Sequence, residues 1–351
     1  MAPHAAHTFV QDCLEAGFAL AGVTSIDPPE RAPIFEQWLE DGMHGAMQWM
    51  ERHRDLRHQP ADLLEDARSI ICVATRYAPA DVKGGAAVAS YARGDDYHKV
   101  MKKQLHALCD QWRGAFPDAQ FRACVDTAPL LERELAERAG LGRVGKNTML
   151  IDPGAGSWLL LGEVLTTLDI APTPADHDDP CASCTRCIDA CPTEALSPWR
   201  LDARRCISAM TIEQRSEIDV QWHDAIGDWL FGCDICQDVC PHNQLTERSA
   251  ALPSAPWTRD RLGLVPVLDV LEWTPQRREA KIAGTAVTRA TLDMMRRNAC
   301  IVAGGMAGHA DLDSIRSVLE AIANAADEPE MVRDAAREAI RRLDASLRSE
   351  S

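Results

Sequence analysis

Eight of the thirteen cysteines of this 351-residue chain fall between residues 181 and 240. The first four follow the pattern Cys-x-x-Cys-x-x-Cys-x-x-x-Cys-Pro, and the last three follow Cys-x-x-Cys-x-x-x-Cys-Pro. Bacterial ferredoxins use the first pattern to bind two cubane iron–sulfur clusters, and the cysteine before proline serves the second cluster. The spacing therefore predicts two 4Fe-4S clusters, each held by four thiolates.

Each predicted cluster combines cysteines of both groups or of one group and a more distant position. The first cluster is assigned to Cys181, Cys184, Cys187 and Cys240. The second cluster is assigned to Cys191, Cys206, Cys233 and Cys236. Spacing alone constrains Cys206 least, because it lies farther from Cys233 than the corresponding ligand does in a small ferredoxin.

Two other uses of clustered cysteines are weighed against this prediction. Structural zinc sites commonly show two separated Cys-x-x-Cys pairs, rather than four cysteines that end in Cys-Pro. A radical enzyme that uses S-adenosylmethionine needs Cys-x-x-x-Cys-x-x-Cys, and no third thiol follows Cys191 at that spacing. The other five cysteines are expected to be buried apolar side chains: Cys13, Cys72, Cys109, Cys124 and Cys300.

Composition narrows the class of protein further. The chain has 37 basic and 53 acidic residues, a formal charge of −16, which argues against broad nonspecific binding of nucleic acid. No run of about 18 apolar residues predicts a transmembrane helix. The N-terminus resembles neither a secretory nor a twin-arginine signal, so we expect a cytoplasmic protein, in which structural disulfides are rare.

Residues 1–172 read as an α/β domain. Apolar, β-branched runs predict strands at 18–26, 69–77, 86–91, 120–126 and 157–168, and helical patterns fill 5–16, 30–41, 97–115 and 129–140. Because strands alternate with helices, we expect a layered sheet. A Pro- and Asp-rich linker leads into a ferredoxin-type domain at residues 173–248.

Residues 249–351 read as an all-α domain. Apolar side chains recur at helical spacing from Ile315 to Ile322 and from Val332 to Leu343, which predicts paired helices like a small HEAT-type repeat. Residues 275–297 carry six basic and two acidic side chains, and we interpret this basic segment either as a solvated helix face or as a contact for nucleic-acid phosphates. Its basic members are Arg277, Arg278, Lys281, Arg289, Arg296 and Arg297.

Two cubane clusters move single electrons and seldom perform the chemistry themselves. The α/β domain in front of them is therefore expected to hold a second redox centre. No Gly-x-Gly-x-x-Gly fingerprint follows a predicted strand, so a Rossmann nicotinamide or flavin site lacks support. The residues alone indicate an oxidoreductase with two clusters and a second cofactor, and a noncatalytic electron carrier is the alternative of a different class.

Further motifs resemble one family, the epoxyqueuosine reductases, over essentially the whole chain. They include HGAMQWM at 44–50, ARSIICVATRY at 67–77, DDYHKV at 95–100, VDTAPLLERELAERAGLG at 125–142, GKNTMLI at 145–151 and GSWLLLGEVLT at 156–166. The most diagnostic are CISAMTIEQR at 206–215 and FGCDICQDVCPHN at 231–243. The first of these supports Cys206 as a ligand of the second cluster. The chain departs from the family at Arg143 and His242, where tryptophan is common, and at Ala209-Met210, which is often Tyr-Leu.

The resemblance implies an enzyme that reduces the epoxide of epoxyqueuosine at the wobble position of tRNA to give queuosine. It implies cobalamin as the second cofactor, with electrons passing from an external low-potential donor of flavodoxin or ferredoxin type through both clusters to cobalt. The Asp-x-His-x-x-Gly signature of histidine-ligated cobalamin is absent, since Met101 stands at the glycine position after Asp96 and His98, so a base-off cobalamin without a histidine ligand fits better. A cobalamin-dependent reductive dehalogenase is the rival reading, and we expect a monomer without membrane contact.

The resemblance also implies roles for single residues. Asp126 matches the proton donor of the family, and a carboxylic acid serves there only if burial or a negative neighbour raises its pKa. Judged alone, Asp126 would sooner be an N-cap of a helix that begins near Pro129. The expected cobalamin contacts are Arg57, Asp126, Leu150, Ser208, Gln237 and Asp238. Tyr97, His98 and Lys146 are also expected to line the pocket, without an assigned role.

Overall fold

The computed structural model describes residues 4–77, 79, 86–175, 178–244 and 254–349. A four-stranded antiparallel sheet forms its N-terminal part, in the order β1 (Leu20–Ser25), β2 (Ser69–Arg76), β7 (Leu159–Thr166) and β4 (Phe121–Cys124). β2 pairs with β7 along eight residues, from Ser69 opposite Thr166 to Arg76 opposite Leu159. The layered α/β arrangement predicted from the sequence is confirmed.

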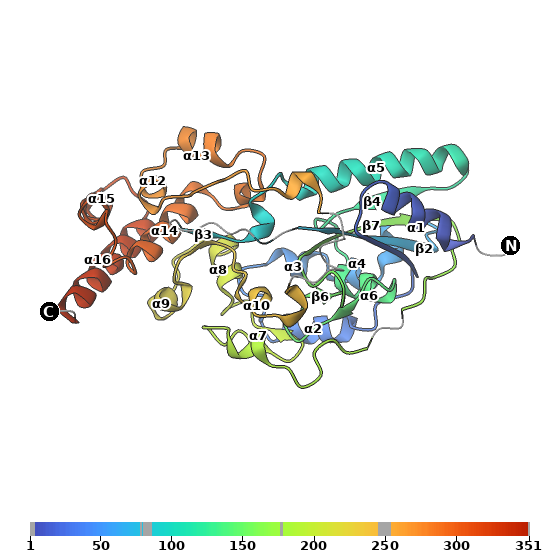
Figure 1. Ribbon diagram of the computed structural model, residues 1–351, viewed down its shortest axis with the longest axis horizontal. Coiled ribbons are helices and arrows are strands. Elements are labelled where there is room, and N and C mark those ends of the chain that lie inside the picture. Colours follow the sequence, from blue (N-terminus) through green and yellow to red (C-terminus); the bar gives the residue numbers. More distant parts are fainter. Residues whose placement is uncertain (1–3, 78, 80–85, 176–177, 245–253, 350–351) are drawn as a thin grey trace.

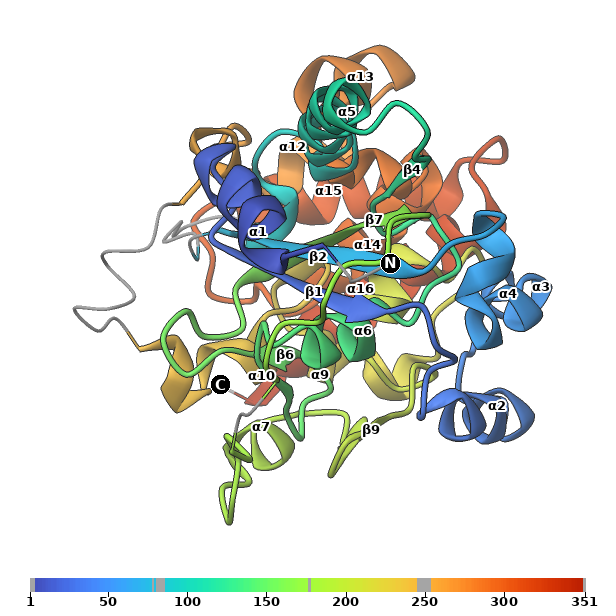
Figure 2. The same cartoon turned by 90° about the vertical axis from the view of Figure 1, so that its right-hand side faces the viewer.

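Helices cover both faces of this sheet (Figure 2). α1 (Ala6–Glu15) and α5 (Tyr97–Ala115) pack on one face, and α6 (Glu132–Arg138) packs on the other. Alternation along the strands divides the core accordingly, since Ile71 and Val73 face α1 and α5, while Ile70 and Cys72 face α6. The sheet end that carries Asp126 is thereby held between two packed layers.

The segment predicted as a strand at 86–91 differs from expectation. Only β3 (Ala87–Val88) is extended, and a 3-10 turn, η2 (Ser90–Ala92), follows it. β3 lies outside the main sheet and pairs in parallel with β10 (Trp229–Phe231), because the N–H of Ala89 donates to the carbonyl of Phe231. A short apolar run is compatible with either sheet, and its partner is distant in sequence.

Short helices, 3-10 turns and two short strands make up the cysteine-rich segment. They are α7 (Arg186–Asp189), β8 (Leu196–Ser197), β9 (Arg200–Leu201), α8 (Ile207–Ile212), η3 (Val220–Trp222), α9 (His223–Ile226), α10 (Ile235–Asp238) and η4 (Pro241–Asn243). Small elements also flank the sheet: α2 (Ala32–Glu40), α3 (Trp49–Arg52), α4 (Arg54–His58), η1 (Pro60–Leu63), β5 (Arg143–Val144) and β6 (Leu150–Ile151).

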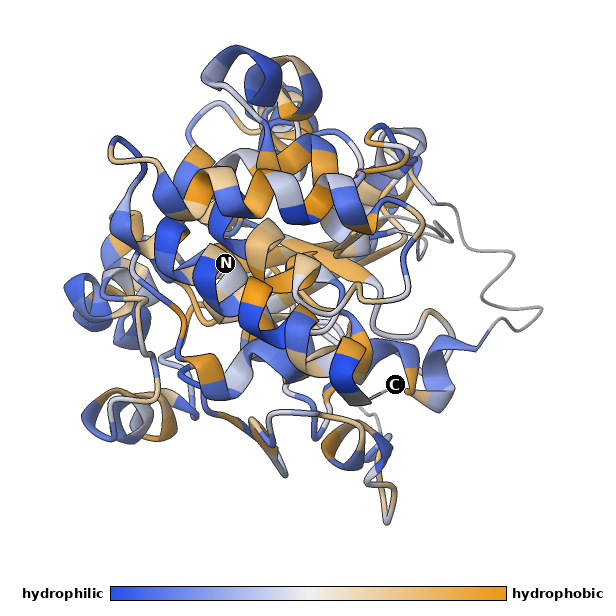
Figure 3. Ribbon diagram, turned by 90° about the vertical axis from the view of Figure 1, so that its left-hand side faces the viewer, coloured by the Kyte–Doolittle hydropathy of each residue, from blue (hydrophilic) through white to orange (hydrophobic). Residues whose placement is uncertain are grey.

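The C-terminal part is helical, as predicted (Figure 1). Its elements are η5 (Pro256–Thr258), α12 (Val267–Leu271), α13 (Pro275–Ile282), η6 (Ala286–Arg289), α14 (Leu292–Ala303), α15 (Leu312–Asn324) and α16 (Glu330–Ser349). Hydrophobic residues alternate with hydrophilic ones along these helices (Figure 3), and Ile315, Leu319, Val332 and Leu343 are buried between them. None of the described helices combines the length and the apolar character needed to cross a membrane.

Buried polar side chains join α14 to the cysteine-rich segment. Arg297 is fully buried and donates to the carbonyls of Met210, Gln214 and Ser216. Asn298 is also fully buried and donates to the carbonyls of Thr211 and Leu230. Unpaired buried carbonyls are unfavourable, so these bonds fix α14 against α8 and β10.

Candidate active site

Four cysteines line a pocket at the surface of the cysteine-rich segment: Cys181, Cys184, Cys187 and Cys240. Burial raises the pKa of the Cys187 thiol, and the neighbouring Cys181 and Cys240 thiols raise it further. Burial likewise raises the pKa of the Cys240 thiol, and the neighbouring Cys181 and Cys184 thiols raise it further. These thiols would repel one another as thiolates, so a bound cation or cluster is the natural partner for them.

The other four cysteines of the region form a second group. Burial raises the pKa of Cys233 to about 12, and Cys206 and Cys191 add to the shift. Cys236 is affected by Cys233 and Cys206 in the same direction. Within each predicted ligand set the thiols thus influence one another, and Cys187 of the first set also raises the pKa of Cys236 of the second.

Backbone amides support both groups of thiols. Cys206 is the N-cap residue of α8, and the N–H groups of Ser208 and Ala209 lie near enough to its sulfur to oppose the rise in its pKa that burial causes. The N–H of Lys146 lies 3.2 Å from the sulfur of Cys181. Such N–H···S bonds stabilise the thiolate form and raise cluster potentials.

Lys146 is tied to the loop of the first group through its side chain as well. It is 7 % exposed, and Nζ donates to the carbonyls of Ala182 at 2.6 Å and Cys184 at 3.1 Å. Its ammonium also lies 5.6 Å from the ring centre of Trp199. Lys146 therefore holds this loop, and its charge lies beside the Cys181 group.

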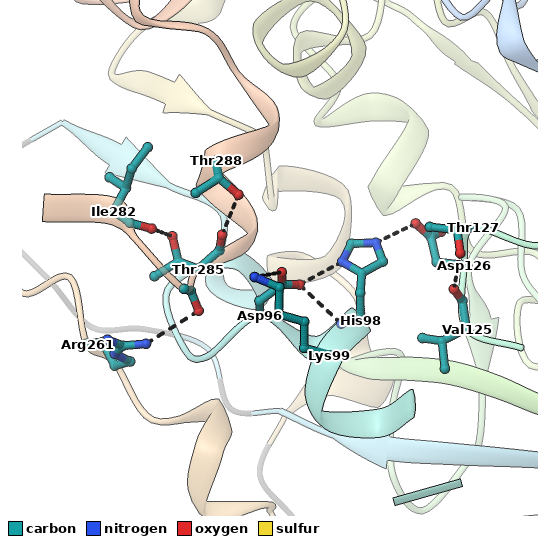
Figure 4. Close-up of polar contacts among 11 residues, drawn as sticks. Asp96, His98, Lys99, Val125, Asp126, Thr127, Arg261, Ile282, Thr285 and Thr288 are labelled. Carbon is teal, nitrogen blue, oxygen red and sulfur yellow. Dashed lines mark hydrogen bonds and ion pairs between the residues drawn. The ribbon is translucent and has the colours of Figure 1, made fainter. Parts of the chain in front are cut away.

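Asp126 follows β4 in a left-handed conformation, with φ +52°. A non-glycine residue there is strained by about 1–3 kcal/mol unless its surroundings hold it. Its Oδ2 lies 2.9 Å from Nε2 of His98, whose Nδ1 lies 2.8 Å from Oδ1 of Asp96 (Figure 4). The alternative of a helix cap is wrong, because α6 begins at Glu132, its N-cap is Leu131, and the carboxylate of Asp126 turns toward His98.

The expected raised pKa of Asp126 is also wrong. Burial opposes its ionisation, but hydrogen bonds and charge from His98, a hydrogen bond from Tyr97 and the charge of Arg133 outweigh burial and lower its pKa. The pKa of His98 is raised, because Asp126 and Asp96 outweigh the effect of burial on the imidazole. The pair therefore favours the charged forms of both groups, with the proton on His98 rather than on Asp126.

Residues of the C-terminal part lie close to His98 and Asp126, because they bond the two residues that precede α5. The carbonyl of Gly284 accepts the N–H of Asp96 at 2.7 Å, and Arg261 pairs with Asp95 at 2.5 Å. Arg289, in η6, forms two bonds with the carboxylate of Glu213 at 2.8 and 3.0 Å, and its guanidinium is near enough to Asp126 to influence it electrostatically.

Two glutamates continue the network behind Asp126. Oε1 of Glu132 accepts the backbone N–H of Asp126 at 2.6 Å. Glu163 of β7 lies against Glu132 and is fully buried. Neither residue was singled out by sequence reasoning, although a carboxylate inside the apolar run LLLGEVLT was a signal that could have identified Glu163.

Arg57 lies between two aromatic rings. It is 5 % exposed, and its guanidinium carbon is 5.7 Å from the ring centre of Phe35 and 5.8 Å from that of Trp49. Its hydrogen bonds within the described residues are to the carbonyl and the sulfur of Met50, at 3.2 and 3.7 Å. Much of the capacity of this five-donor group is therefore still available.

The other expected cofactor contacts occupy different surroundings. Gln237 is 5 % exposed, accepts a bond from Ser157 and donates to the hydroxyl of Tyr77 at 3.3 Å. Asp238 is exposed, Ser208 is partly buried, and Leu150 packs in the apolar cluster on the α6 side of the sheet. The amide of Gln237 thus already has two partners from within the chain.

The basic segment at 275–297 does not form one phosphate-binding surface. Arg297 is fully buried, and Arg296 bonds both carboxylate oxygens of Glu328 at 2.6 Å. Including these two residues in a nucleic-acid contact is therefore wrong. Arg277, Lys281 and Arg289 are exposed.

Comparison with known proteins identifies two parts of the chain. A family model described as "4Fe-4S double cluster binding domain" matches residues 180–243, so the chain is an iron–sulfur protein of the two-cluster class. A second family model, described as "Epoxyqueuosine reductase QueG, DUF1730", matches residues 57–127.

Relatives match most of the chain. The epoxyqueuosine reductase of Pseudomonas aeruginosa is 35 % identical over 93 % of this chain and 91 % of its own length. That of Xanthomonas campestris is 37 % identical over 85 % of this chain and 86 % of its own length, and that of Escherichia coli is 34 % identical over 83 % and 78 %. The chain belongs to the epoxyqueuosine reductase family.

Solved structures share the whole fold. A crystal structure of epoxyqueuosine reductase with an epoxyqueuosine-modified tRNA-Tyr stem loop aligns with a TM-score of 0.84 at 25 % identity, and covers 98 % of this chain and 91 % of that one. The structure of the Bacillus subtilis enzyme aligns with a TM-score of 0.84 at 26 % identity over 96 % and 90 %.

Proposed function

We propose that this chain reduces the epoxide of epoxyqueuosine in tRNA to give queuosine. The observation that carries the proposal is the match of almost the whole chain to relatives named epoxyqueuosine reductase. The structural relative bound to a modified stem loop supports tRNA as the substrate. The reductive dehalogenase alternative has no comparable support along the chain.

The two groups of thiols support the assignment of the clusters. Cys181, Cys184, Cys187 and Cys240 hold the first cluster in this proposal, and Cys191, Cys206, Cys233 and Cys236 hold the second. The first group lines a surface pocket, so an external low-potential donor can approach it. The second group lies closer to the candidate active site, because Cys236 influences Arg133, which in turn influences Asp126.

The residues of the site are compatible with cobalamin. Both ring nitrogens of His98 are engaged by carboxylates, which agrees with a cobalt that lacks a histidine ligand. Arg57 has guanidinium donors to spare for amide or phosphate oxygens of the cofactor. Leu150, Ser208, Gln237 and Asp238 remain predicted contacts. Cobalamin, when bound, supplies the electrons for reduction of the strained ring.

The protons for the departing oxygen come from the chain. In this proposal His98 carries a proton at Nε2, next to Oδ2 of Asp126. When substrate and cofactor displace water, the charged pair of imidazolium and carboxylate loses solvation, and transfer of that proton to Asp126 becomes more favourable. The oxygen leaves as water, which takes two electrons from the external donor and two protons. Asp126 can deliver each proton, and His98 regains its own from solvent between the two transfers while Asp96 keeps its bond to Nδ1.

An anaerobic turnover experiment tests the function. The purified chain is reconstituted with iron, sulfide and cobalamin, reduced, and incubated with epoxyqueuosine tRNA, which is digested for mass analysis. We expect loss of one oxygen from the nucleoside, dependent on cobalamin and abolished by Asp126→Asn. Full cluster and cobalamin content without loss of oxygen would contradict the proposed substrate.

The remaining expectations from the sequence belong to this proposal. We infer a cytoplasmic enzyme, since its proposed substrate is tRNA, and a monomeric state stays a prediction from the sequence. The ferredoxin-like and HEAT-like character of the last two parts of the chain, and their boundaries at residues 173 and 249, stay predictions.

A further inference from the structure

Glu163 is a carboxyl group in the middle of an apolar sheet face. It is fully buried, and it lies between Leu161 and Leu165 along β7. Its register neighbours on the flanking strands are Cys72 and Cys124. All four neighbours belong to or pack against the apolar cluster under α6, so this face offers little solvation for a charge.

The partner of Glu163 is another carboxyl group. Within the described part of the chain, no amide, hydroxyl or basic donor meets either of its oxygens. Its electrostatic neighbour is instead the side chain of Glu132 on α6, which is half-buried. Two carboxylates in contact at such a place would repel each other, whereas a protonated carboxyl group donates a hydrogen bond to an ionised one.

Glu132 connects this contact to Asp126. Its Oε1 accepts the backbone N–H of Asp126 at 2.6 Å, and that residue has φ +52°. A rigid acceptor at this amide would hold the backbone in a conformation that aspartate adopts rarely. The orientation of the Asp126 carboxylate toward His98 depends on the same backbone.

We propose that Glu163 is a positioning residue that acts as a neutral hydrogen-bond donor to Glu132, which in turn holds the backbone of Asp126 in place. This rests on the proposed function only in that Asp126 is the residue being positioned. Glu163 itself lies beneath the site, at the centre of the sheet, and its effect on the reaction is transmitted through the Asp126 amide.

Charges around the pair are consistent with a retained proton. Burial is the main cause that raises the pKa of both carboxyl groups, to about 8 for Glu132, and Asp126 raises both further. Arg133 acts in the opposite direction on Glu132. Cys72 and Cys124 face Glu163 from β2 and β4 as neutral thiols, since burial raises their own pKa values.

The test compares two replacements of Glu163. Glu163→Gln keeps a neutral donor of similar shape, whereas Glu163→Leu keeps only the volume. The first readout is hydrogen exchange of the amides at 125–131, measured on the reconstituted protein without substrate. We expect Glu163→Gln to exchange like the unaltered protein and Glu163→Leu to exchange faster.

The second readout is single-turnover reduction of epoxyqueuosine tRNA as a function of pH. Glu163→Gln should stay within about threefold of the unaltered enzyme, the scale of one adjusted hydrogen bond. Glu163→Leu should lose about 100-fold in rate, with cobalamin content and KM for tRNA unchanged, as expected for a misplaced acid. The matched control is Glu134→Gln, on the same helix as Glu132. The carboxylate of Glu134 accepts the N–H groups of Glu30 and Arg31 and not that of Asp126.

Each outcome decides the proposal. Equal exchange and rates for Glu163→Leu and the unaltered protein would overturn it, and so would a Glu163→Gln variant that is as defective as Glu163→Leu. If Glu163→Leu does not fold, the Gln variant still decides, because an ionised Glu163 would be badly replaced by an amide. If no variant and no unaltered protein reduces the tRNA, the proposed function fails, while the exchange data still test the role of Glu163.

Discussion

The imidazole of His98 lies between two carboxylates, 2.8 Å from Asp96 through Nδ1 and 2.9 Å from Asp126 through Nε2. The side chain of Asp126 is 51 % exposed, whereas that of His98 is 32 % exposed. In the proposed reaction, the more exposed carboxylate of Asp126 would meet the substrate, and His98, whose pKa the two carboxylates raise, would store the proton. This arrangement gives the site an acid without requiring a protonated aspartic acid before the substrate binds.

Replacing His98 with glutamine should slow the reaction by about 100-fold or more, the usual contribution of a general acid. The pKa of His98 is raised by Asp126 and Asp96, so the unaltered enzyme should lose rate as pH rises through that raised pKa. Single-turnover rates across pH should show that decline, and the decline should disappear in His98→Gln. His106→Gln, at an exposed position on the same helix, is the control, and an equal loss there would contradict the assignment.

Removing one cysteine of each group should remove one cluster at a time. Cys184→Ala and Cys233→Ala should each reduce bound iron from about eight to about four per chain, since each cubane cluster needs its four thiolates. Iron analysis and electron paramagnetic resonance after reduction measure this. Cys109→Ala, a buried thiol of α5 outside both groups, should keep all the iron. Full iron content in Cys233→Ala would contradict its assignment.

Arg289 is an exposed basic side chain of the C-terminal part near Asp126, where it can meet the substrate. It is 48 % exposed, pairs with Glu213 and influences Asp126 electrostatically. Arg289→Glu should raise the KM for the tRNA stem loop about tenfold and lower the salt dependence of binding by about one phosphate contact. Arg289→Lys should lose less. Arg341→Glu, on the exposed surface of α16, should change neither value, and an equal effect there would mean that only net charge matters.

Arg297 should matter for stability and not for tRNA contact. Its guanidinium satisfies three backbone carbonyls in a fully buried position. Arg297→Met should lower the free energy of unfolding by about 2–4 kcal/mol, because carbonyls of the segment after α8 lose their donors. Denaturant unfolding monitored by circular dichroism measures this, with Arg341→Met as the surface control. An unchanged unfolding midpoint would show that water replaces the guanidinium.

The carboxyl pair of Glu132 and Glu163 also predicts a pH dependence of stability. Burial raises the pKa of both groups, to about 8 for Glu132, so the folded pair keeps a proton that the unfolded chain releases above its ordinary pKa of 4.5. This contribution is fully present below pH 4.5 and is lost as pH rises toward 8, at no more than about 1.4 kcal/mol per pH unit for one proton. Glu163→Gln, which keeps a neutral donor and removes a titrating group, should flatten that part of the curve. An identical slope in the variant would contradict a retained proton.

The sequence predicted the sheet because its strands are long and apolar. The runs at 69–77 and 157–168 became β2 and β7, which are buried on both faces of a covered sheet. The extended segment at 86–91 was predicted, but its partner was not, because β10 lies far away along the chain. Local pattern determines which residues are extended, and tertiary packing determines with which strand they pair.

The sequence predicted residues of the candidate site, but it did not predict how these residues shift one another's pKa values. Asp126 was expected to be the acid, but its pKa depends on His98, which a separate helix brings to it. The prediction that Arg296 and Arg297 of the basic segment contact phosphates was wrong for a similar reason. Charge density along the chain does not tell whether an arginine such as Arg297 faces water or the carbonyls of another element.

The bonds from Arg297 and Asn298 to α8 also bear on how the protein is made. All eight cysteines between residues 181 and 240 leave the ribosome before α14 has been synthesised, since the chain grows from its N-terminus. Until then, the walls around Cys206 and Cys233 lack the helix that fixes them. With the proposed ligands, the second cluster would therefore reach its final geometry late in biogenesis, and a chain that ends before Asn298 would present these thiols without the helix that supports them.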